Sequence, residues 1–347
     1  MKKIRFGITG SGYMGRTHAE AVQYHRDTAE LVAIWGGSRA GSLAERCSVV
    51  AEPTLESLMA RPDIDAIVIT TPQHVHCQEA LLAMESGKHV LVEKPMATKV
   101  EDCDRMLAAA AKHKRVLSVA YNLRFRINLP NVKRLIAEGA IGRVQSMHYS
   151  MIRQASVAGK FGGNKTSWVE LPEVIGFVID ALPHGVDAIR WSTGAEVKRV
   201  AGFSRTFLAG RQIEDTTVGI MEYTNGAICS VHVTKASDGE YKGEMARLGI
   251  VGSKGNLEMD GFGDLYLSDR AKGWRLVSTQ PPVNPDDPDA AFKEGRMLAF
   301  RNQVGAFMDT INGKSAAIGT GFDGRQGLAA CLGLMKSSSE GRFVDLS

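Results

Sequence analysis

The sequence predicts an α/β protein of two domains, in which an N-terminal doubly wound parallel sheet is followed by an α+β domain with a large, mainly antiparallel open sheet. Three observations lead to this prediction. Over residues 1–122, short apolar runs alternate with amphipathic stretches, as strands and helical crossovers do in a parallel sheet. The glycine-rich loop GSGYMG directly follows the first apolar run. After residue 122 long β-rich runs predominate, and Asn225-Gly226 supplies a type I′ hairpin turn between two of them.

Length and composition allow two globular domains. The chain has 347 residues, of which 44% are hydrophobic and 23% charged, which suffices for two cores and excludes a disordered chain. We expect domains at residues 1–122 and 123–347. The formal net charge of +4 is small and the basic residues are scattered, which argues against nucleic acid as a partner.

The N-terminal stretch MKKIRFGITG lacks the continuous apolar segment of a signal peptide. We find no apolar run long enough to cross a bilayer, so we expect no membrane association. The cysteines are odd in number and widely spaced, without a Cys-x-x-Cys pair, which predicts reduced thiols in a cytoplasmic protein. They are Cys47, Cys77, Cys103, Cys229 and Cys331.

The elements of the first half follow from periodicity and from start and stop signals. Thr54, with the acid Glu56 two residues later, predicts a helix start, and Gly87 predicts a helix end. Strands are expected at 4–9, 30–35, 66–70, 89–92 and 115–122, and helices at 13–24, 42–47, 54–60, 76–87 and 99–113.

The second half follows a different pattern. A helix is expected at 130–138, then long strands at 143–152 and 197–204, and then the hairpin 216–234 around Asn225-Gly226. Further strands follow, separated by the turns GSKGN and DRAKG.

The loop GSGYMG has the spacing G-x-G-x-x-G between a strand and a helix. In this context, backbone N–H groups and the helix N-terminus bind a pyrophosphate. The alternative is a tight turn without a ligand. We assign cofactor binding to the loop residues Gly10, Gly12, Tyr13, Met14 and Gly15.

The stretch WGGSRAGS follows the second strand, where the usual NAD fingerprint has an acid for the ribose hydroxyls. No Asp or Glu occurs there, whereas Ser38 and Arg39 are suited to a 2′-phosphate. The sequence therefore favours NADP over NAD. The alternative is that Arg39 is a solvated loop charge.

The stretch VEKPMA follows the strand 89–92 and contains Glu93, Lys94 and Pro95. Either the strand merely ends here, or the chain fixes a lysine amine at the carboxyl edge of the sheet, where open α/β folds bind ligands. Pro95 restricts the backbone beside the lysine. Glu93 either holds the lysine charged or contacts the cofactor ribose.

The stretch IDALPHGVD places Asp180 and His184 four residues apart, and Asp187 three residues further along. On a helix, the first two share a face, so the carboxylate can orient an imidazole that acts as a general acid and base. The alternative is a helix N-terminus with Asp180 as its cap and Pro183 in its first turn.

Together, the motifs GSGYMG, TTPQHVH, EKP, YNLRF and DALPHGVD resemble, in their order and intervals, the glucose-fructose oxidoreductase and inositol dehydrogenase (Gfo/Idh/MocA) family, over nearly the whole chain. The resemblance implies an NAD(P)-binding Rossmann domain at 1–122, a substrate-binding and oligomerisation domain at 123–347, and an active site between them. It implies a homodimer or homotetramer. It also implies that Lys94 contacts substrate and nicotinamide, and that His184, beside Asp180, accepts and donates the proton.

The resemblance extends to the channel of the cofactor. It implies that Thr71, Pro72, His76 and Glu93 line this channel, and that the Lys94-Pro95 bond is cis. In one place the sequence departs from the family, because VIGFVIDAL keeps only Gly176 of three glycines and has Leu182 in place of another glycine. We name Arg124, Lys165 and Trp168 as candidate substrate contacts, each of which is equally compatible with packing or a surface position.

The expected function is an NADP- or NAD-dependent oxidoreductase that transfers a hydride between nicotinamide and a secondary alcohol or ketone of a sugar, cyclitol or related polyol. No metal is needed. His74, His76 and His89 are possible ligands by residue type, but His74 and His76 lack a carboxylate or cysteine at ligand spacing, which favours cap or loop roles. Two alternatives stay open: a glycosidase-like enzyme that uses NAD transiently, and a non-catalytic, cofactor-sensing regulator of the same fold.

Overall fold

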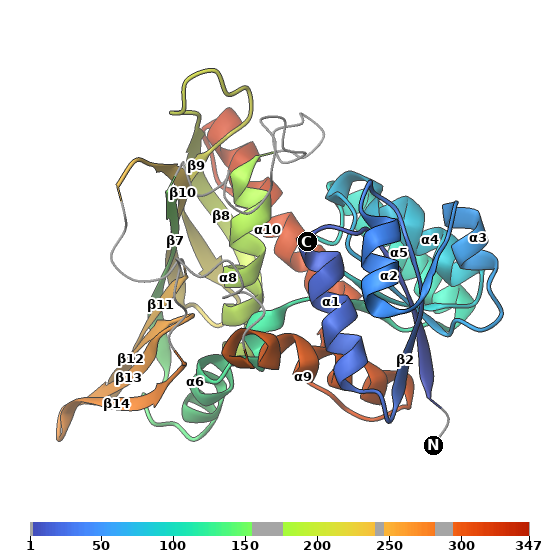
Figure 1. Ribbon diagram of the computed structural model, residues 1–347. Helices are drawn as coiled ribbons and strands as arrows, with labels where there is room; N and C mark the ends of the chain where they lie inside the picture. Colours follow the sequence, from blue (N-terminus) through green and yellow to red (C-terminus); the bar gives the residue numbers. More distant parts are fainter. Residues whose placement is uncertain (1–2, 155–175, 240–245, 282–293, 347) are drawn as a thin grey trace. The chain divides into compact units, whose positions relative to one another are not determined.

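The computed structural model describes residues 3–154, 176–239, 246–281 and 294–346, and the chain forms two compact units (Figure 1). Unit 1 contains Met1–Asn122 and Asp287–Arg325, and unit 2 contains Leu123–Asp286 and Gln326–Ser347. The chain therefore divides after Asn122, but the expected second domain at 123–347 differs from unit 2. Residues 287–325 group with unit 1 because a late helix packs on its first helix and a late strand extends its sheet.

Unit 1 is built around a seven-stranded sheet in the order β15-β6-β5-β4-β1-β2-β3. Its parallel strands are β1 (Ile4–Thr9), β2 (Ala29–Trp35), β3 (Val50–Ala51), β4 (Ala66–Ile69), β5 (His89–Val92) and β6 (Leu117–Val119), and β15 (Gly319–Thr320) pairs antiparallel with β6. Since β1 has β2 on one side and β4 on the other, the strand order reverses here, which is where such sheets bind ligands.

The helices of unit 1 are α1 (Tyr13–Tyr24), α2 (Ala40–Cys47), α3 (Leu55–Ala60), α4 (His76–Glu85), α5 (Val100–His113) and α9 (Glu294–Ile311), with a 3-10 turn η1 (Gln73–Val75). Thr54 caps α3, as predicted, because its side chain accepts a hydrogen bond from Ser57 N at 3.0 Å. Helix α9 closes the core, with Phe307 packed 6.3 Å from Phe6 of β1 between ring centroids.

Unit 2 is built around a nine-stranded sheet in the order β14-β13-β12-β11-β7-β10-β9-β8-β16. The neighbours β7 and β10 are parallel and the other pairs are antiparallel. The strands are β7 (Val144–Gln154), β8 (Val197–Arg205), β9 (Thr216–Tyr223), β10 (Ile228–Ser237), β11 (Arg247–Gly252), β12 (Gly255–Asp260), β13 (Asp264–Asp269), β14 (Gly273–Thr279) and β16 (Val344–Asp345).

Helices cover one face of this sheet (Figure 1). They are α6 (Asn128–Ala137), α8 (Phe177–Thr193) and α10 (Gly321–Glu340), and a 3-10 turn η2 (Asn122–Phe125) precedes them. Helix α8 packs on β7, β9 and β10, and α6 packs on β12 to β14. Gly202 and Gly219 leave the room that Leu334 of α10 occupies.

The opposite face of the sheet carries apolar side chains that stay exposed. Cross-strand partners run in one row from Leu276 of β14 to Ile220 of β9. The exposed large apolar residues of this face include Val218, Ile220, Ile228, Trp274 and Leu276, which are 47–58% exposed. Within the described ranges, no helix is both long enough and apolar enough to span a membrane.

Candidate functional site

The glycine loop joins β1 to α1 and presents backbone rather than side chains. Gly10 has φ +90°, and a side chain at Gly15 would collide with the carbonyl of Gly10, so both positions require glycine. Gly12 is the N-cap of α1, where no side chain caps the helix and no acid lies in the first turn. These features fit the pyrophosphate of a dinucleotide at the positive end of the helix.

The end of β2 lies against this loop. Gly10 N donates to Trp35 O at 2.7 Å, and Gly36 and Gly37 have φ +92° and +79°. A carboxylate for the ribose is therefore absent at this point, since glycine backbone occupies its place. Beyond it, Arg39 is exposed, and its guanidinium approaches the open side of Gly12.

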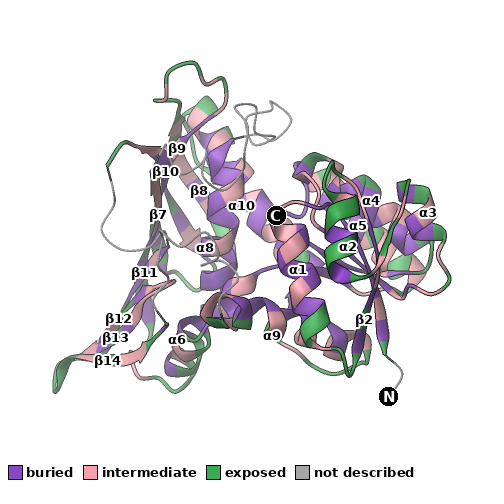
Figure 2. Ribbon diagram, viewed as in Figure 1, coloured by how far each residue is buried: buried purple, intermediate pink, exposed green. Residues whose placement is uncertain are grey.

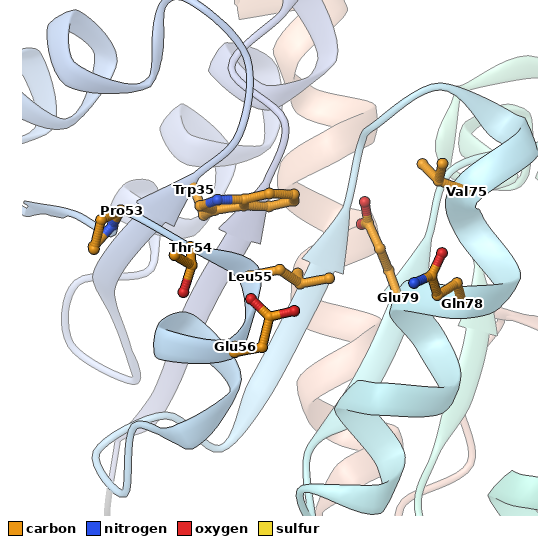
Figure 3. Close-up of a pocket in the computed structure, with 8 residues that line it drawn as sticks. All are labelled: Trp35, Pro53, Thr54, Leu55, Glu56, Val75, Gln78 and Glu79. Atoms are coloured by element: carbon orange, nitrogen blue, oxygen red, sulfur yellow. The ribbon is translucent and has the colours of Figure 1, made fainter.

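A cavity of about 360 Å³ opens beside the end of β2 (Figure 3). Figure 3 shows the indole of Trp35 and the carboxylate of Glu79, from α4, among the groups that line it. The other lining residues are Pro53, Thr54, Leu55, Glu56, Val75 and Gln78. An aromatic wall and a buried acid therefore lie near the carboxyl edge of the sheet.

Glu79 is a buried acid that the sequence analysis did not single out. Its Oε2 accepts hydrogen bonds from Thr9 Oγ1 at 2.5 Å and Thr71 Oγ1 at 3.0 Å. Burial raises the pKa of Glu79 to about 7, because the charged form loses its hydration. A signal was present, since position 79 falls on the same helical face as Ala80 and Ala83, which are buried.

The EKP motif follows β5, and its Lys94-Pro95 bond is cis, as predicted. In the stretch Val90–Thr98, Lys94 alone is half-exposed and every other residue is buried. Glu93 Oε1 lies 2.8 Å from Nε2 of His18, and its Oε2 accepts from Lys94 N at 3.2 Å. Within this stretch, the fold therefore leaves only Lys94 partly accessible to solvent.

His76, expected in the cofactor channel, is 1% exposed. Its Nδ1 lies 3.0 Å from Pro95 O and its Nε2 lies 2.8 Å from Thr71 O. Burial lowers the pKa of His76, so the neutral ring donates to one of these two carbonyls at a time. The ring ties the loop after β4 to the loop after β5, while Thr71 and Pro72 stay half-exposed.

In unit 2, α8 begins at Phe177, three residues before Asp180. Its N-terminus is held by Glu214, which accepts hydrogen bonds from Phe177 N through its backbone and from Val178 N through its carboxylate. Asp180 is therefore not the helix cap, and Pro183 lies beyond the first turn. That alternative reading of the segment was wrong.

Asp180 and His184 lie one turn apart on α8, and in the stretch Phe177–Arg190 they alone are half-exposed. Figure 2 shows α8 coloured mainly as buried. Asp180 Oδ2 accepts a hydrogen bond from Arg153 Nη1 of β7 at 3.2 Å. Arg153 thus holds the carboxylate in place beside the turn that carries the imidazole. Leu182, where the family pattern has a glycine, is fully buried.

Asp187 and Arg124 form a buried ion pair, with Nε to Oδ2 at 2.9 Å and Nη2 to Oδ1 at 2.5 Å. The guanidinium also lies 5.6 Å from the ring of Trp191. This geometry favours the packing role among the alternatives for Arg124. Lys165 and Trp168, the other candidate substrate contacts, lie outside the described residues. In the described part of the chain, we find no cluster of three His, Cys, Asp or Glu residues fit to bind a metal.

Comparison with known proteins relates both halves of the chain to one family. Residues 4–121 match the oxidoreductase family with an NAD-binding Rossmann fold, Gfo/Idh/MocA, and residues 130–258 match the Gfo/Idh/MocA C-terminal domain. Inositol 2-dehydrogenase 3 of Saccharopolyspora erythraea is 24% identical over 349 residues, which are 99% of this chain and 96% of that protein.

Two further comparisons agree. The 2,7-anhydro-N-acetylneuraminate hydratase of Mediterraneibacter gnavus is 23% identical over 77% of this chain and 73% of its own length. A levoglucosan dehydrogenase, solved in complex with NADH and levoglucosan, has the same fold, with a TM-score of 0.83 and 23% identity over 99% of each chain. Because the two family models together match well over half of the chain, it belongs to the Gfo/Idh/MocA family of oxidoreductases.

Proposed function

We propose that this oxidoreductase transfers a hydride between NAD(P) and a secondary alcohol or ketone of a sugar, cyclitol or related polyol. One observation carries the proposal: Lys94, a half-exposed residue, directly follows β5 at the carboxyl edge of the same parallel sheet as the glycine loop. An ammonium in that place suits the reacting oxygen of an alcohol next to a bound nicotinamide. The names of the inositol and levoglucosan dehydrogenases support a polyol or sugar substrate.

In this proposal the residues divide the proton and charge chemistry between them. His184 takes the hydroxyl proton during oxidation and returns it during reduction. Lys94 donates a hydrogen bond to the same oxygen and stabilises its negative charge. Asp180, held by Arg153, orients the imidazole. Bound nicotinamide supplies or accepts the hydride.

We further propose that NADP is preferred over NAD. Gly36 and Gly37 leave no carboxylate for the 2′-hydroxyl at the end of β2, and the guanidinium of Arg39 lies near Gly12 at the start of α1. In the described part of the chain, no salt bridge engages Arg39, so its charge is available to a 2′-phosphate. The family description and the levoglucosan dehydrogenase complex speak for NAD, and the preference is therefore a property to be tested on this chain.

A second candidate is a lyase or glycosidase-like reaction in which NAD is reduced and reoxidised within one turnover. The similarity to a hydratase of an anhydro-sugar favours it. Lys94 and His184 would have the same roles in its redox steps. It is distinguished by product formation without net change in nicotinamide absorbance.

We also propose a homo-oligomer, dimer or tetramer, formed through the open face of the nine-stranded sheet. Exposed apolar residues gather on this face, as in interfaces between subunits. A second copy is the occupant that we propose, because a two-fold interface brings the same surface patch of both subunits together, and one exposed apolar face then covers the other.

The experiment that tests the function is a panel of sugars, cyclitols and polyols, with their ketones, assayed by nicotinamide absorbance with both cofactors. We expect turnover of at least one compound by the native protein and none by Lys94→Ala. Absence of turnover in both directions, with cofactor bound and with products analysed for net-neutral chemistry, would contradict both candidate functions.

A further inference from the structure

His18 occupies an unusual position for a histidine, fully buried on α1 three residues after the last glycine of the loop. Its Nε2 lies 2.8 Å from Glu93 Oε1, and its ring meets Phe300 of α9 edge-on, with centroids 5.8 Å apart. Its Nδ1 has no hydrogen-bond partner in the described part of the chain. Since a carboxylate only accepts, Nε2 carries the hydrogen of this bond. A single directed bond therefore fixes a ring that is otherwise held by packing.

Glu93 passes this constraint on to the lysine. Its carboxylate is buried, with Oε1 toward His18 and Oε2 accepting from the backbone N–H of Lys94 at 3.2 Å. The backbone N–H of Glu93 itself donates to Ile69 O of β4 at 2.9 Å. Both oxygens of the carboxylate are thus engaged, one by the helix and one by the peptide unit from which the Lys94 side chain extends.

On its other side, the same loop is fixed by His76, which lies against Pro95 O and Thr71 O. If His18 is removed, this contact stays, but the Glu93 carboxylate loses its buried donor and is free to turn away from Lys94 N. An ion or dipole left without a partner in a buried site reorganises its surroundings. The loop that carries Lys94 is then fixed by His76 alone, and no longer by both His76 and the His18–Glu93 bond.

We propose that His18 is a positioning residue for Lys94. Through Glu93 it couples the backbone of Lys94 to α1, the helix whose N-terminus fits the pyrophosphate. The position of Lys94, at the reacting end of the cofactor site, is thereby fixed relative to α1, at the phosphate-binding end. The inference rests on the proposed function only in that Lys94 contacts the reacting oxygen.

The first test compares two substitutions of the same residue. His18→Leu fills the space but removes the donor, whereas the amide of His18→Gln reaches Glu93 from about the place of Nε2. We expect His18→Leu to lower kcat by about 10- to 100-fold, as for a misplaced catalytic group, with the cofactor dissociation constant changed less than about two-fold. His18→Gln should recover most of the loss.

A matched control lies at the C-terminal end of the same helix. His25 follows α1, and its Nε2 lies 2.8 Å from the backbone oxygen of Arg301 on α9, a contact remote in the chain from Glu93 and Lys94. His25→Leu removes a histidine bond of equal length, but one that joins the end of α1 to α9 instead of joining α1 to Glu93. We expect it to lower the unfolding temperature while leaving kcat within about two-fold.

An independent readout uses the protein without cofactor or substrate. The rate of reductive methylation of the Lys94 amine, measured by mass spectrometry of its peptide, reports where the amine lies. We expect this rate to change at least about three-fold in His18→Leu and to return in His18→Gln. Lys88, whose Nζ donates to Arg61 O and Ile64 O, serves as the internal reference and should keep its rate.

The outcomes separate this inference from the proposed function. Unchanged labelling of Lys94 together with unchanged kcat in folded His18→Leu overturns the positioning role. If native protein turns over no compound of the panel, the proposed function fails, and labelling alone still decides on His18. Should His18→Leu not fold, the pair His18→Gln and His18→Asn tests the same bond, because only the longer amide reaches Glu93; equal labelling in both would overturn the role.

Discussion

Asp180 and His184 lie one turn apart on α8 and are the two half-exposed residues of a stretch, Phe177–Arg190, that is otherwise buried. Along this stretch of α8, only these two side chains are accessible to solvent or to a ligand. Such a pair is what a proton-transfer site on a rigid element requires. The arrangement makes the imidazole the first group to substitute.

We expect His184→Ala to lower kcat by about 10²- to 10⁴-fold, the usual contribution of a general acid or base. Its effect on stability should stay small because the side chain is partly exposed. Steady-state kinetics with a substrate from the panel gives kcat, and calorimetry gives the cofactor dissociation constant, which should not change. His113→Ala, at a half-exposed histidine of α5, is the control and should behave as the native protein. Native-like turnover by folded His184→Ala would remove this residue from the mechanism.

Glu79 predicts a dependence of stability on pH. Burial raises the pKa of this carboxyl from 4.5 to about 7 in the folded protein. Below pH 4.5 the carboxyl is protonated in both the folded and the unfolded chain, so its ionisation does not lower the free energy of unfolding. Between 4.5 and 7 the unfolded chain ionises first, and the free energy of unfolding falls as the pH rises. Above pH 7 the full cost is present, about 3 kcal/mol from the difference in pKa.

Urea unfolding at intervals between pH 5 and 8.5 measures this dependence. Glu79→Gln should be less dependent on pH than the native protein and should gain relative stability at the alkaline end. Glu56→Gln, at an exposed acid lining the same cavity, should show the native pH dependence. Parallel curves for the native protein and Glu79→Gln would mean that the buried carboxyl keeps an ordinary pKa.

Local patterns were enough to predict most elements of both sheets. The first strand and helix, Ile4–Thr9 and Tyr13–Tyr24, have the predicted bounds, because strand alternation, glycine spacing and helical periodicity are all encoded within a few residues. Strand β3 was not predicted, since Val50–Ala51 is too short to show a period. The placement of α9 in unit 1 depends on contacts such as Phe307 with Phe6, which leave no local signal.

The site was predictable to the extent that motifs mark it. The glycine loop and the cis Lys94-Pro95 bond follow from spacing and family resemblance. The supports behind them do not, because His18 and Glu93 are 75 residues apart and meet only in the folded sheet. The same holds for His76: its place in the motif predicts the cofactor channel, but no local signal predicts that both of its ring nitrogens lie against backbone oxygens.

Arg39 predicts how the protein distinguishes its cofactors. Removing a charged partner of a phosphate costs about 1.5–3 kcal/mol, or about 10- to 100-fold in affinity. Arg39→Ala should weaken NADP by this factor and NAD by less than about two-fold, as measured by calorimetry. Arg46→Ala is the control of equal charge, since Arg46 lies on α2, the helix that begins directly after Arg39, and its Nη2 lies 3.5 Å from Glu20 Oε1. Equal NADP affinity in Arg39→Ala would exclude the assignment.

Arg124 and Asp187 predict a change in stability rather than in substrate binding. Breaking a buried ion pair from one side costs about 3–5 kcal/mol, because the remaining charge loses its oppositely charged neighbour. We expect Arg124→Leu to lower the free energy of unfolding by this amount, and the double variant with Asp187→Leu to recover a large part of it. The KM measured on folded Arg124→Leu should equal that of the native protein. A rise in KM with native stability would instead make Arg124 a substrate contact.

The open sheet face predicts the assembly of the protein. Ile220 of β9 lies in the middle of the cross-strand row and is 49% exposed. If a second copy covers it, Ile220→Lys buries an unpaired ammonium in the interface, a cost that an oligomer avoids by dissociating. Light scattering after size exclusion should then give a smaller mass than for the native protein, with an unchanged circular dichroism spectrum.

The control is Val50→Lys. It replaces an apolar strand residue that is 47% exposed in the other unit, so it adds the same charge without changing this face. A native mass for Val50→Lys and a reduced mass for Ile220→Lys place the interface on the sheet; equal masses for both would place it elsewhere or show that the native protein is a monomer.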